Sequence, residues 1–256
     1  MPAASSLQPE LIKRRFVILA ASRSGSNMLC RMLDSHPSIL CHHEIYNPKG
    51  IRLAVALRET GFTLGTTADR ERDPEAFLEH VWIRPTDIEC VGFKFTHRQN
   101  ETIYHRLLTD SCIAKIVLRR KNRMKIYVSQ KISEALSEWE VYRQQDLVRD
   151  RPRVIIDPRL FLERVAFDKA YYTEIREAMR TGGQSWIEVF YEDLFSLDTQ
   201  QMIVRFLGFN PAANDLKIRS IKQNSHDLRD LIANYDDLCR YFEATEYAAE
   251  LADMGN

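Results

Sequence analysis

The stretch FVILAASRSGSNMLCRMLDSHPSILCHHEIYNP, residues 16–48, carries the strongest structural signal in this sequence. It opens with six apolar residues, 16–21, a run that is too short for a buried helix and rich in strand formers. A loop of small and polar residues, 22–27, follows, and apolar residues then recur at helical spacing up to Pro37. The stretch therefore predicts a strand, a small-residue loop and a helix in succession.

The predicted loop has the features of an anion-binding site. The first backbone N–H groups of a helix have no carbonyl partner within the helix, and the helix dipole favours an anion beside them. Arg23 adds a full positive charge two positions before Gly25. The pattern indicates a site for a phosphate-like group, and the alternative is an ordinary tight turn with Gly25 at a positive φ.

The same loop differs from the P-loop that binds nucleoside triphosphates. That loop reads G-x-x-x-x-G-K-[ST], in which the Lys reaches the terminal phosphates and the Ser or Thr binds magnesium. Here Ser26 follows Gly25 and no Lys comes after it. The difference favours an anion whose chemistry needs no metal, and it argues against a nucleotide kinase or NTPase.

Composition sets the broad class of the protein. The 256 residues include 36 Lys plus Arg and 36 Asp plus Glu, so no basic field indicates a nucleic-acid partner. No apolar run approaches the roughly 20 residues of a membrane span, and the N-terminus lacks the apolar core of a secretory signal. Five scattered cysteines without a Cys-x-x-Cys pair indicate reduced thiols and a cytoplasmic location.

Strand and helix signals alternate along the remaining chain. Strands are expected at 38–41, 91–95, 113–118 and 186–190, and helices at 51–60, 100–109, 122–148 and between Asp157–Pro158 and Gly182–Gly183. Residues 63–74 are expected to form a surface loop. The alternation predicts a P-loop-like, three-layer α/β fold whose central parallel sheet is flanked by helices. It is expected to form one domain over residues 1–256, with 1–14 as a flexible N-terminal segment.

A second basic cluster occupies residues 115–133, KIVLRRKNRMKIYVSQKIS. A predicted strand ends in Arg119 and Arg120, a helix begins near Asn122, and Ser129 lies nine residues after Arg120. Arginine offers paired donors that match a phosphate, and a Ser hydroxyl offers a neutral one. The cluster therefore indicates a second phosphate contact, and a solvated basic helix start is the alternative.

The loop Arg-Ser-Gly-Ser, followed by x-Met-Leu and Ser-His-Pro, resembles the 5′-phosphosulfate loop of sulfotransferases that use 3′-phosphoadenosine 5′-phosphosulfate (PAPS). The resemblance recurs at 92–94, 118–129, 191–194 and 228–238, and it is strongest to the bacterial carbohydrate and nodulation-factor-type branch. It implies PAPS as the sulfuryl donor, no required metal, and a small-molecule or carbohydrate acceptor. The residues that it implies for donor binding are Arg23, Ser24, Gly25, Ser26, Asn27, Met28, Arg120, Ser129 and Lys222. Whether Arg119 or Arg120 binds the 3′-phosphate stays open, as does the oligomeric state.

Sulfuryl transfer requires cations near the leaving oxygen and a base for the acceptor proton. Arg23 and Lys94, both at predicted strand ends, are the candidates for the cations. Glu44 is the preferred base, because its surroundings resemble those of a catalytic glutamate in bacterial members of the family. His97 is the second candidate, since cytosolic sulfotransferases place a histidine just past a strand-borne Lys. A noncatalytic nucleotide-binding module, without a working base, remains the alternative.

Two further motifs have smaller roles in this interpretation. The acidic pair Glu192–Asp193 is expected to cap and orient the neighbouring basic loops. The cluster His42-His43-Glu44 invites a comparison with zinc sites. Adjacent histidines on an extended segment point to opposite faces, however, and no further His or Cys has ligand spacing. No metal site is therefore expected.

Overall fold

The computed structural model describes residues 14–82, 88–97, 99–139, 151–211, 216–217, 225 and 227–253. Its centre is a five-stranded sheet in the order β2-β3-β1-β4-β5, and every pair of neighbours is parallel. The strands are β1 (Arg14–Ala20), β2 (Ile39–His42), β3 (Cys90–Thr96), β4 (Ile113–Arg119) and β5 (Trp186–Phe190). Since β2 and β3 lie on one side of β1 and β4 and β5 on the other, the loop after β1 lies where the strand order reverses. Open α/β sheets bind their ligands at such a point.

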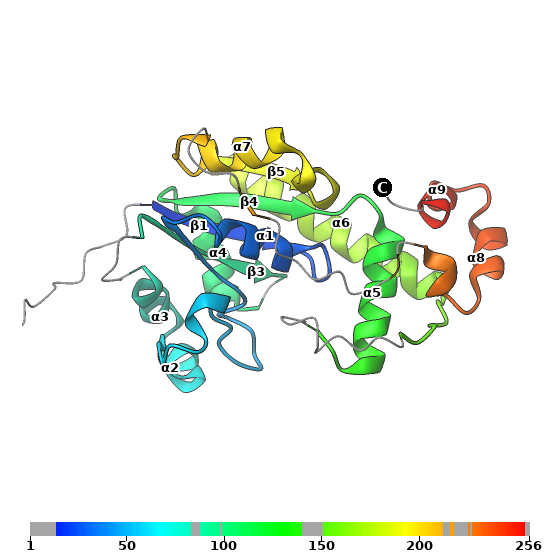
Figure 1. Ribbon diagram of the computed structural model, residues 1–256, viewed down its shortest axis with the longest axis horizontal. Helices are drawn as coiled ribbons and strands as arrows, with labels where there is room; N and C mark the ends of the chain where they lie inside the picture. Colours follow the sequence, from blue (N-terminus) through cyan, green and yellow to red (C-terminus); the bar gives the residue numbers. More distant parts are fainter. Residues whose placement is uncertain are drawn as a thin grey trace, which may run out of the picture.

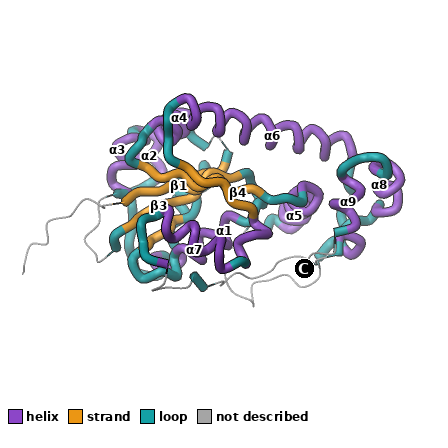
Figure 2. Tube along the Cα trace, turned by 90° about the horizontal axis from the view of Figure 1, so that it is seen from above, coloured by secondary structure: helices purple, strands orange, loops and turns teal. Residues whose placement is uncertain are grey.

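Helices cover both faces of the sheet (Figure 2). One face packs against α1 (Ser26–Leu33) and α7 (Leu197–Phe206), and the other against α3 (Pro74–Val81), α4 (Glu101–Thr109) and α6 (Pro158–Thr181). Side chains of β1 alternate between the two cores: Phe16 and Ile18 face α1 and α7, whereas Val17 and Leu19 face α4 and α6. The predicted three-layer α/β fold is therefore confirmed.

A group of helices lies beyond the carboxyl end of β4 (Figure 1). It consists of α5 (Arg123–Leu136), α8 (Tyr235–Phe242) and α9 (Tyr247–Ala252), which share a separate apolar core with the first turns of α6. The carboxylate of Glu250 in α9 accepts hydrogen bonds from the backbone N–H groups of Arg123 (2.6 Å) and Met124 (2.9 Å). The N-terminus of α5 is thus capped by a side chain from α9.

Two predictions around residues 51–74 are wrong. The expected helix at 51–60 is reduced to a single 3-10 turn, Val55–Leu57, and the expected loop at 63–74 contains the short helix α2 (Thr67–Arg72). A capping box between Thr66 and Asp69 starts α2. The guanidinium of Arg70 is buried and donates to the carbonyls of Ile45 (2.8 Å) and Asn47 (2.9 Å), which fixes α2 to the segment after β2.

The helix expected at 122–148 is shorter than predicted. It ends at Leu136 because Ser137 adopts a left-handed conformation with φ of 52°, and residues 140–150 lie outside the described residues. The predicted bounds of α6 are confirmed: the Asp157 side chain caps its first turn, and Gly182 follows its last residue. Of the expected flexible segment 1–14, only Arg14 is described, and it belongs to β1. In the part of the chain that the structure describes, no helix has the length and apolarity to cross a bilayer.

Candidate functional site

The loop between β1 and α1 has a left-handed backbone at two residues. Gly25 has φ of 92° and Arg23 has φ of 67°. Gly25 is the N-cap residue of α1, and it has no side chain that could bind the first amides of the helix. Ser24 is fully buried, and its hydroxyl donates to the carbonyl of Ala21 at 2.8 Å, which closes the turn. The loop therefore presents the N-terminus of α1 at the carboxyl edge of the sheet.

The ring of Tyr191 packs directly on this loop. A Cβ atom added to Gly25 would lie 2.1 Å from Cδ2 of Tyr191, so only glycine fits at position 25. The guanidinium of Arg120 lies 4.8 Å from the centre of the same ring, within the range of cation–π attraction. Tyr191 thus lies between the loop after β1 and the basic cluster after β4, and it contacts both.

Arg23 joins the two clusters that the sequence singles out. Its Nε and Nη2 atoms donate to the hydroxyl of Ser129 at 3.0 and 2.9 Å, and its Nη1 donates to the carbonyl of Trp139 at 2.6 Å. Arg120 Nη1 donates to the carbonyl of Arg23 at 3.5 Å. Arg23, Ser129 and Arg120 are therefore neighbours, although more than 90 residues separate Arg23 from Arg120.

The two arginines at the end of β4 point in different directions. Arg119 forms an ion pair with Glu188 at 2.8 Å, on the face covered by α6. Arg120 turns toward the loop, and its Nε is buried without a hydrogen-bond partner in the described part of the chain. Burial lowers the pKa of Arg120 from its ordinary value, although Tyr191 and Glu192 act in the opposite direction. The Glu192 carboxylate lies 3.9 Å from the Nε of Arg120, which is too far for a hydrogen bond. Among the described residues the donor therefore has no acceptor, and an anion beside Arg120 could supply one.

The acidic pair after β5 binds the start of the basic segment. Both carboxylate oxygens of Glu192 accept from the backbone N–H of Lys121, at 3.1 and 3.0 Å. Asp193 forms an ion pair with the Lys121 ammonium at 2.7 Å. The geometry agrees with the predicted role of this pair in orienting a basic loop.

Lys94 and Glu44 meet on the β3 side of the loop. The Lys94 side chain is 3 % exposed, and its ammonium lies 2.9 Å from Glu44 Oε1 and also donates to the side-chain oxygen of Asn27. Asn47 and Gln99 donate to Glu44 Oε2 at 2.6 and 3.0 Å. The structure thus brings together three residues predicted from separate elements: Asn27 of α1, Glu44 after β2 and Lys94 of β3.

His97 lies on the other side of the loop, toward α6. Its Nδ1 is 3.4 Å from the hydroxyl of Ser22, and its Nε2 is 3.2 Å from Oδ1 of Asp168. The rings of Phe167 and Tyr171 flank the imidazole, with centroids 5.3 and 5.2 Å away. The two candidate bases therefore belong to two different hydrogen-bond networks.

Tyr172 and Asp168 were not predicted from the sequence. The hydroxyl of Tyr172 accepts from the N–H of Ala21 and donates to the carbonyl of Leu118, both at 2.8 Å, and so joins the ends of β1 and β4. Burial raises its pKa above the ordinary value. Both residues belong to α6, whose sequence predicts an amphipathic helix and indicates no functional residue. The one readable signal was Arg164, four residues before Asp168, since this spacing favours an ion pair.

One predicted donor-binding residue cannot be placed in this geometry. Lys222 lies outside the described residues. Within the described part of the chain, no group of three or more His, Cys, Asp or Glu side chains could hold a metal ion.

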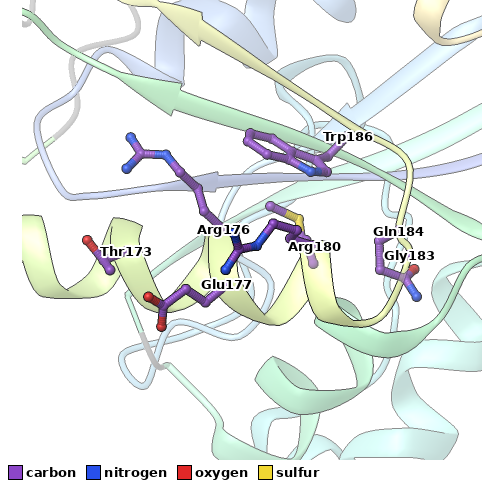
Figure 3. A pocket seen from close by; sticks show the side chains of 8 residues that line it. Thr173, Arg176, Glu177, Arg180, Gly183, Gln184 and Trp186 are labelled. Carbon is purple, nitrogen blue, oxygen red and sulfur yellow. The ribbon is translucent and has the colours of Figure 1, made fainter.

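A cavity of about 660 Å³ lies at the opposite end of the sheet, between α6 and the start of β5 (Figure 3). Its lining includes Arg176, Arg180 and Trp186, none of which contacts the loop after β1 in the described structure.

Comparison with known proteins establishes the fold. No protein-family model and no curated protein matches the sequence. A sulfotransferase from Alicyclobacillus acidocaldarius has a similar structure, with a TM-score of 0.52 and 16% identity over 94% of this chain and 95% of that chain. The mouse sulfotransferase SULT7A1 complexed with PAP aligns with a TM-score of 0.43 and 12% identity over 94% of this chain and 88% of that chain. The chain thus has the α/β fold of a sulfotransferase of known structure.

Proposed function

We propose that this protein is a PAPS-dependent sulfotransferase with a single transferase domain. It moves a sulfuryl group from PAPS to a hydroxyl or amine of a small-molecule or carbohydrate acceptor, and it releases adenosine 3′,5′-bisphosphate. The observation that carries the proposal is the pairing of Arg23 with Ser129, reinforced by the contact of Arg120 with the Arg23 carbonyl. A donor with two phosphate-type groups needs two anion sites side by side, and these three residues provide donors for both.

The donor would be held by groups of different kinds. The first amides of α1, with Ser24, Gly25, Ser26, Asn27 and Met28 around them, would bind the phosphosulfate end. Arg120 and Ser129 would bind the 3′-phosphate, because Arg119 is already engaged by Glu188. When bound, PAPS supplies the activated sulfur. The Lys94 side chain of β3 donates to the Asn27 side chain in the first turn of α1, so Lys94 lies beside the amides that would bind the phosphosulfate.

In the transfer step the acceptor oxygen or nitrogen forms a bond to sulfur while the bond from sulfur to the phosphate oxygen breaks. The electron pair of the broken bond stays on the departing phosphate. Lys94 and Arg23 would stabilise the negative charge that develops there, because fixed cations in a partly buried site need no reorganisation. The acceptor proton passes to a base, and Glu44 and His97 are the two candidates near the loop.

Thermal unfolding with two ligands tests the proposal. Adenosine 3′,5′-bisphosphate at 100 times its dissociation constant should stabilise the native state by about 2.7 kcal/mol. Arg120→Ala should abolish that shift, whereas Arg52→Ala, at an exposed position, should keep it. A purified protein that then transfers labelled sulfuryl groups from PAPS to an acceptor panel would support the full proposal.

The same measurement separates the competing functions. A shift with ATP and magnesium, and none with the bisphosphate, would contradict the proposal and favour a nucleotide kinase or NTPase. A shift with the bisphosphate, together with no transfer to any acceptor in the panel, would favour a noncatalytic nucleotide-binding module.

A further inference from the structure

The two ring nitrogens of His97 contact groups of different character. Nε2 lies 3.2 Å from the carboxylate of Asp168, and Nδ1 lies 3.4 Å from the hydroxyl of Ser22. An ionised carboxylate can only accept hydrogen bonds, so the nitrogen that faces it must carry a hydrogen. In a neutral imidazole the other nitrogen then carries no hydrogen, and its lone pair can accept from the Ser22 hydroxyl. The contacts therefore select the tautomer with the hydrogen on Nε2 and the basic lone pair on Nδ1.

Asp168 is itself fixed in place. Arg164, one turn earlier on α6, donates from Nε to both carboxylate oxygens at 2.9 Å. The same guanidinium donates to the side-chain oxygen of Gln130 on α5 and to the carbonyl of Ser22 at 3.4 Å. Arg164 thus ties the carboxylate to α5 and to the loop after β1. An orienting group that is anchored on several elements can hold its partner in one geometry.

His97 is also constrained through its backbone. Its φ is 48°, an unusual value for a residue with a Cβ atom, and its N–H donates to the carbonyl of Ala20 at 3.3 Å. The left-handed conformation turns the chain directly after β3. The imidazole is only partly covered, since 23 % of the side chain is exposed. It can therefore be reached from solvent while its orientation stays fixed.

The surroundings of Glu44 are different. Its carboxylate accepts from Lys94, Asn47 and Gln99, so its two oxygens already bind three donors. A carboxylate in such a position neutralises the buried ammonium of Lys94 and keeps it in place. The lone pair of His97 Nδ1, in contrast, faces one neutral donor at the long distance of 3.4 Å, the hydroxyl of Ser22.

We propose that Asp168 is a positioning residue. It holds the His97 ring so that Nδ1 takes the proton from the hydroxyl or amine that accepts the sulfuryl group. The catalytic part rests on the proposed function. In the step, the acceptor O–H or N–H proton passes to Nδ1, and the resulting imidazolium keeps its Nε2–H bonded to the Asp168 carboxylate. Glu44 then serves as the counter-ion of Lys94.

The tautomer of His97 can be measured without any activity assay. Nitrogen-15 NMR of labelled histidines, at about pH 9 where an ordinary imidazole is neutral, distinguishes the two tautomers. The His97 signal is assigned by its loss in His97→Gln. The wild-type protein should show the hydrogen on Nε2, and Asp168→Asn should move the population toward Nδ1–H. Glu163→Gln, which removes an exposed carboxylate from the same helix, should leave the signal unchanged.

A wild-type protein with the hydrogen on Nδ1 would overturn the assignment, even if Asp168→Asn failed to fold. An unchanged tautomer in a folded Asp168→Asn protein would overturn the positioning role.

Kinetics test the catalytic part separately. In an enzyme that transfers sulfuryl groups, Asp168→Asn should lower kcat by about 10²- to 10⁴-fold with little change in KM for PAPS. Glu163→Gln should have the wild-type kcat. If kcat were unchanged in Asp168→Asn, the catalytic role would be refuted while the proposed function stood. If the tautomer were as expected but PAPS neither bound nor reacted, the proposed function would fail and the Asp168–His97 arrangement would remain.

Discussion

Gly25 and Tyr191 are in such close contact that a Cβ atom at position 25 would lie 2.1 Å from the tyrosine ring. Gly25→Ala must therefore displace the ring or the loop, in addition to straining a backbone with φ of 92°. We expect the substitution to lower the free energy of unfolding by about 2–4 kcal/mol, from the overlap and the backbone strain together. Urea denaturation measures this change. Binding of adenosine 3′,5′-bisphosphate should weaken at least tenfold.

Two variants separate the overlap from the backbone strain. Gly61 also has a positive φ, 75°, but no atom within 4 Å of an added Cβ, so Gly61→Ala should cost about 1–2 kcal/mol. Tyr191→Ala removes the ring, and the double variant with Gly25→Ala should then be less destabilised than the sum of the two single variants. Strict additivity would show that the ring does not restrict position 25.

Tyr172 and its neighbour Tyr171 form a matched pair for a test of stability. Tyr172→Phe leaves the buried N–H of Ala21 without its acceptor and should cost about 2 kcal/mol. Tyr171 is equally buried, but its hydroxyl has no hydrogen-bond partner in the described part of the chain, so Tyr171→Phe should be nearly neutral. Chemical denaturation of both variants gives the comparison. Equal losses would contradict the assigned role of the Tyr172 hydroxyl.

Arg23→Lys tests whether the shape of the guanidinium matters. A lysine keeps the charge but donates from a single nitrogen, so it cannot reproduce the paired contact of Nε and Nη2 with the Ser129 hydroxyl. We expect affinity for adenosine 3′,5′-bisphosphate to fall about 10- to 100-fold, in line with the loss of one or two charge-assisted hydrogen bonds. Isothermal calorimetry measures the affinity. Arg52→Lys, at an exposed position, is the control and should bind like the wild type.

Glu188 gives a prediction for the dependence of stability on pH. Burial acts to raise its pKa, but hydrogen bonds and charge from Arg176 and Arg119 outweigh burial, and the pKa lies below the ordinary 4.5. Between the folded and unfolded pKa values the unfolded chain binds more protons. The stabilisation by Glu188 is therefore complete above about pH 5 and is lost as the pH falls through the lowered pKa.

Glu188→Gln provides the measurement. At pH 7 this variant should be less stable than the wild type by about 1–2 kcal/mol, as expected for a half-buried ion pair. The difference should shrink when unfolding is followed from pH 5 down to about pH 3. A difference that stayed constant over this range would contradict the lowered pKa.

The regular core of the fold could be predicted from the sequence because its signals are local. The apolar run before Arg23, the small-residue loop and the Asp157–Pro158 helix start each lie within a few residues, and the structure has each of them. The helix α2 was missed for a physical reason. Ala68 is its only apolar residue, and the buried guanidinium of Arg70 holds it to the segment after β2. Hydrophobic periodicity carries no trace of such a contact.

Residue types at the candidate site were also readable, but their partners were not. The sequence singles out Arg23, Lys94 and His97 by type and by their positions at strand ends. It does not indicate that Lys94 lies against Glu44, or that Asp168 lies against His97 from 71 residues further along the chain. The first pair depends on how β2 and β3 lie side by side in the sheet, and the second on how α6 packs across it. Both arrangements follow from tertiary packing rather than from any short motif.

The cap that Glu250 places on α5 has a consequence for the order of folding. Glu250 follows Arg123 by 127 residues, and it supplies an acceptor for the first amides of the helix that carries Ser129. During synthesis, the backbone N–H groups of Arg123 and Met124 therefore gain this acceptor only after α9 has left the ribosome. The sheet and the loop after β1 can form earlier. The part of the candidate site that α5 supplies is thus completed last. A nascent chain would therefore form the loop after β1 well before the proposed two-phosphate site is complete.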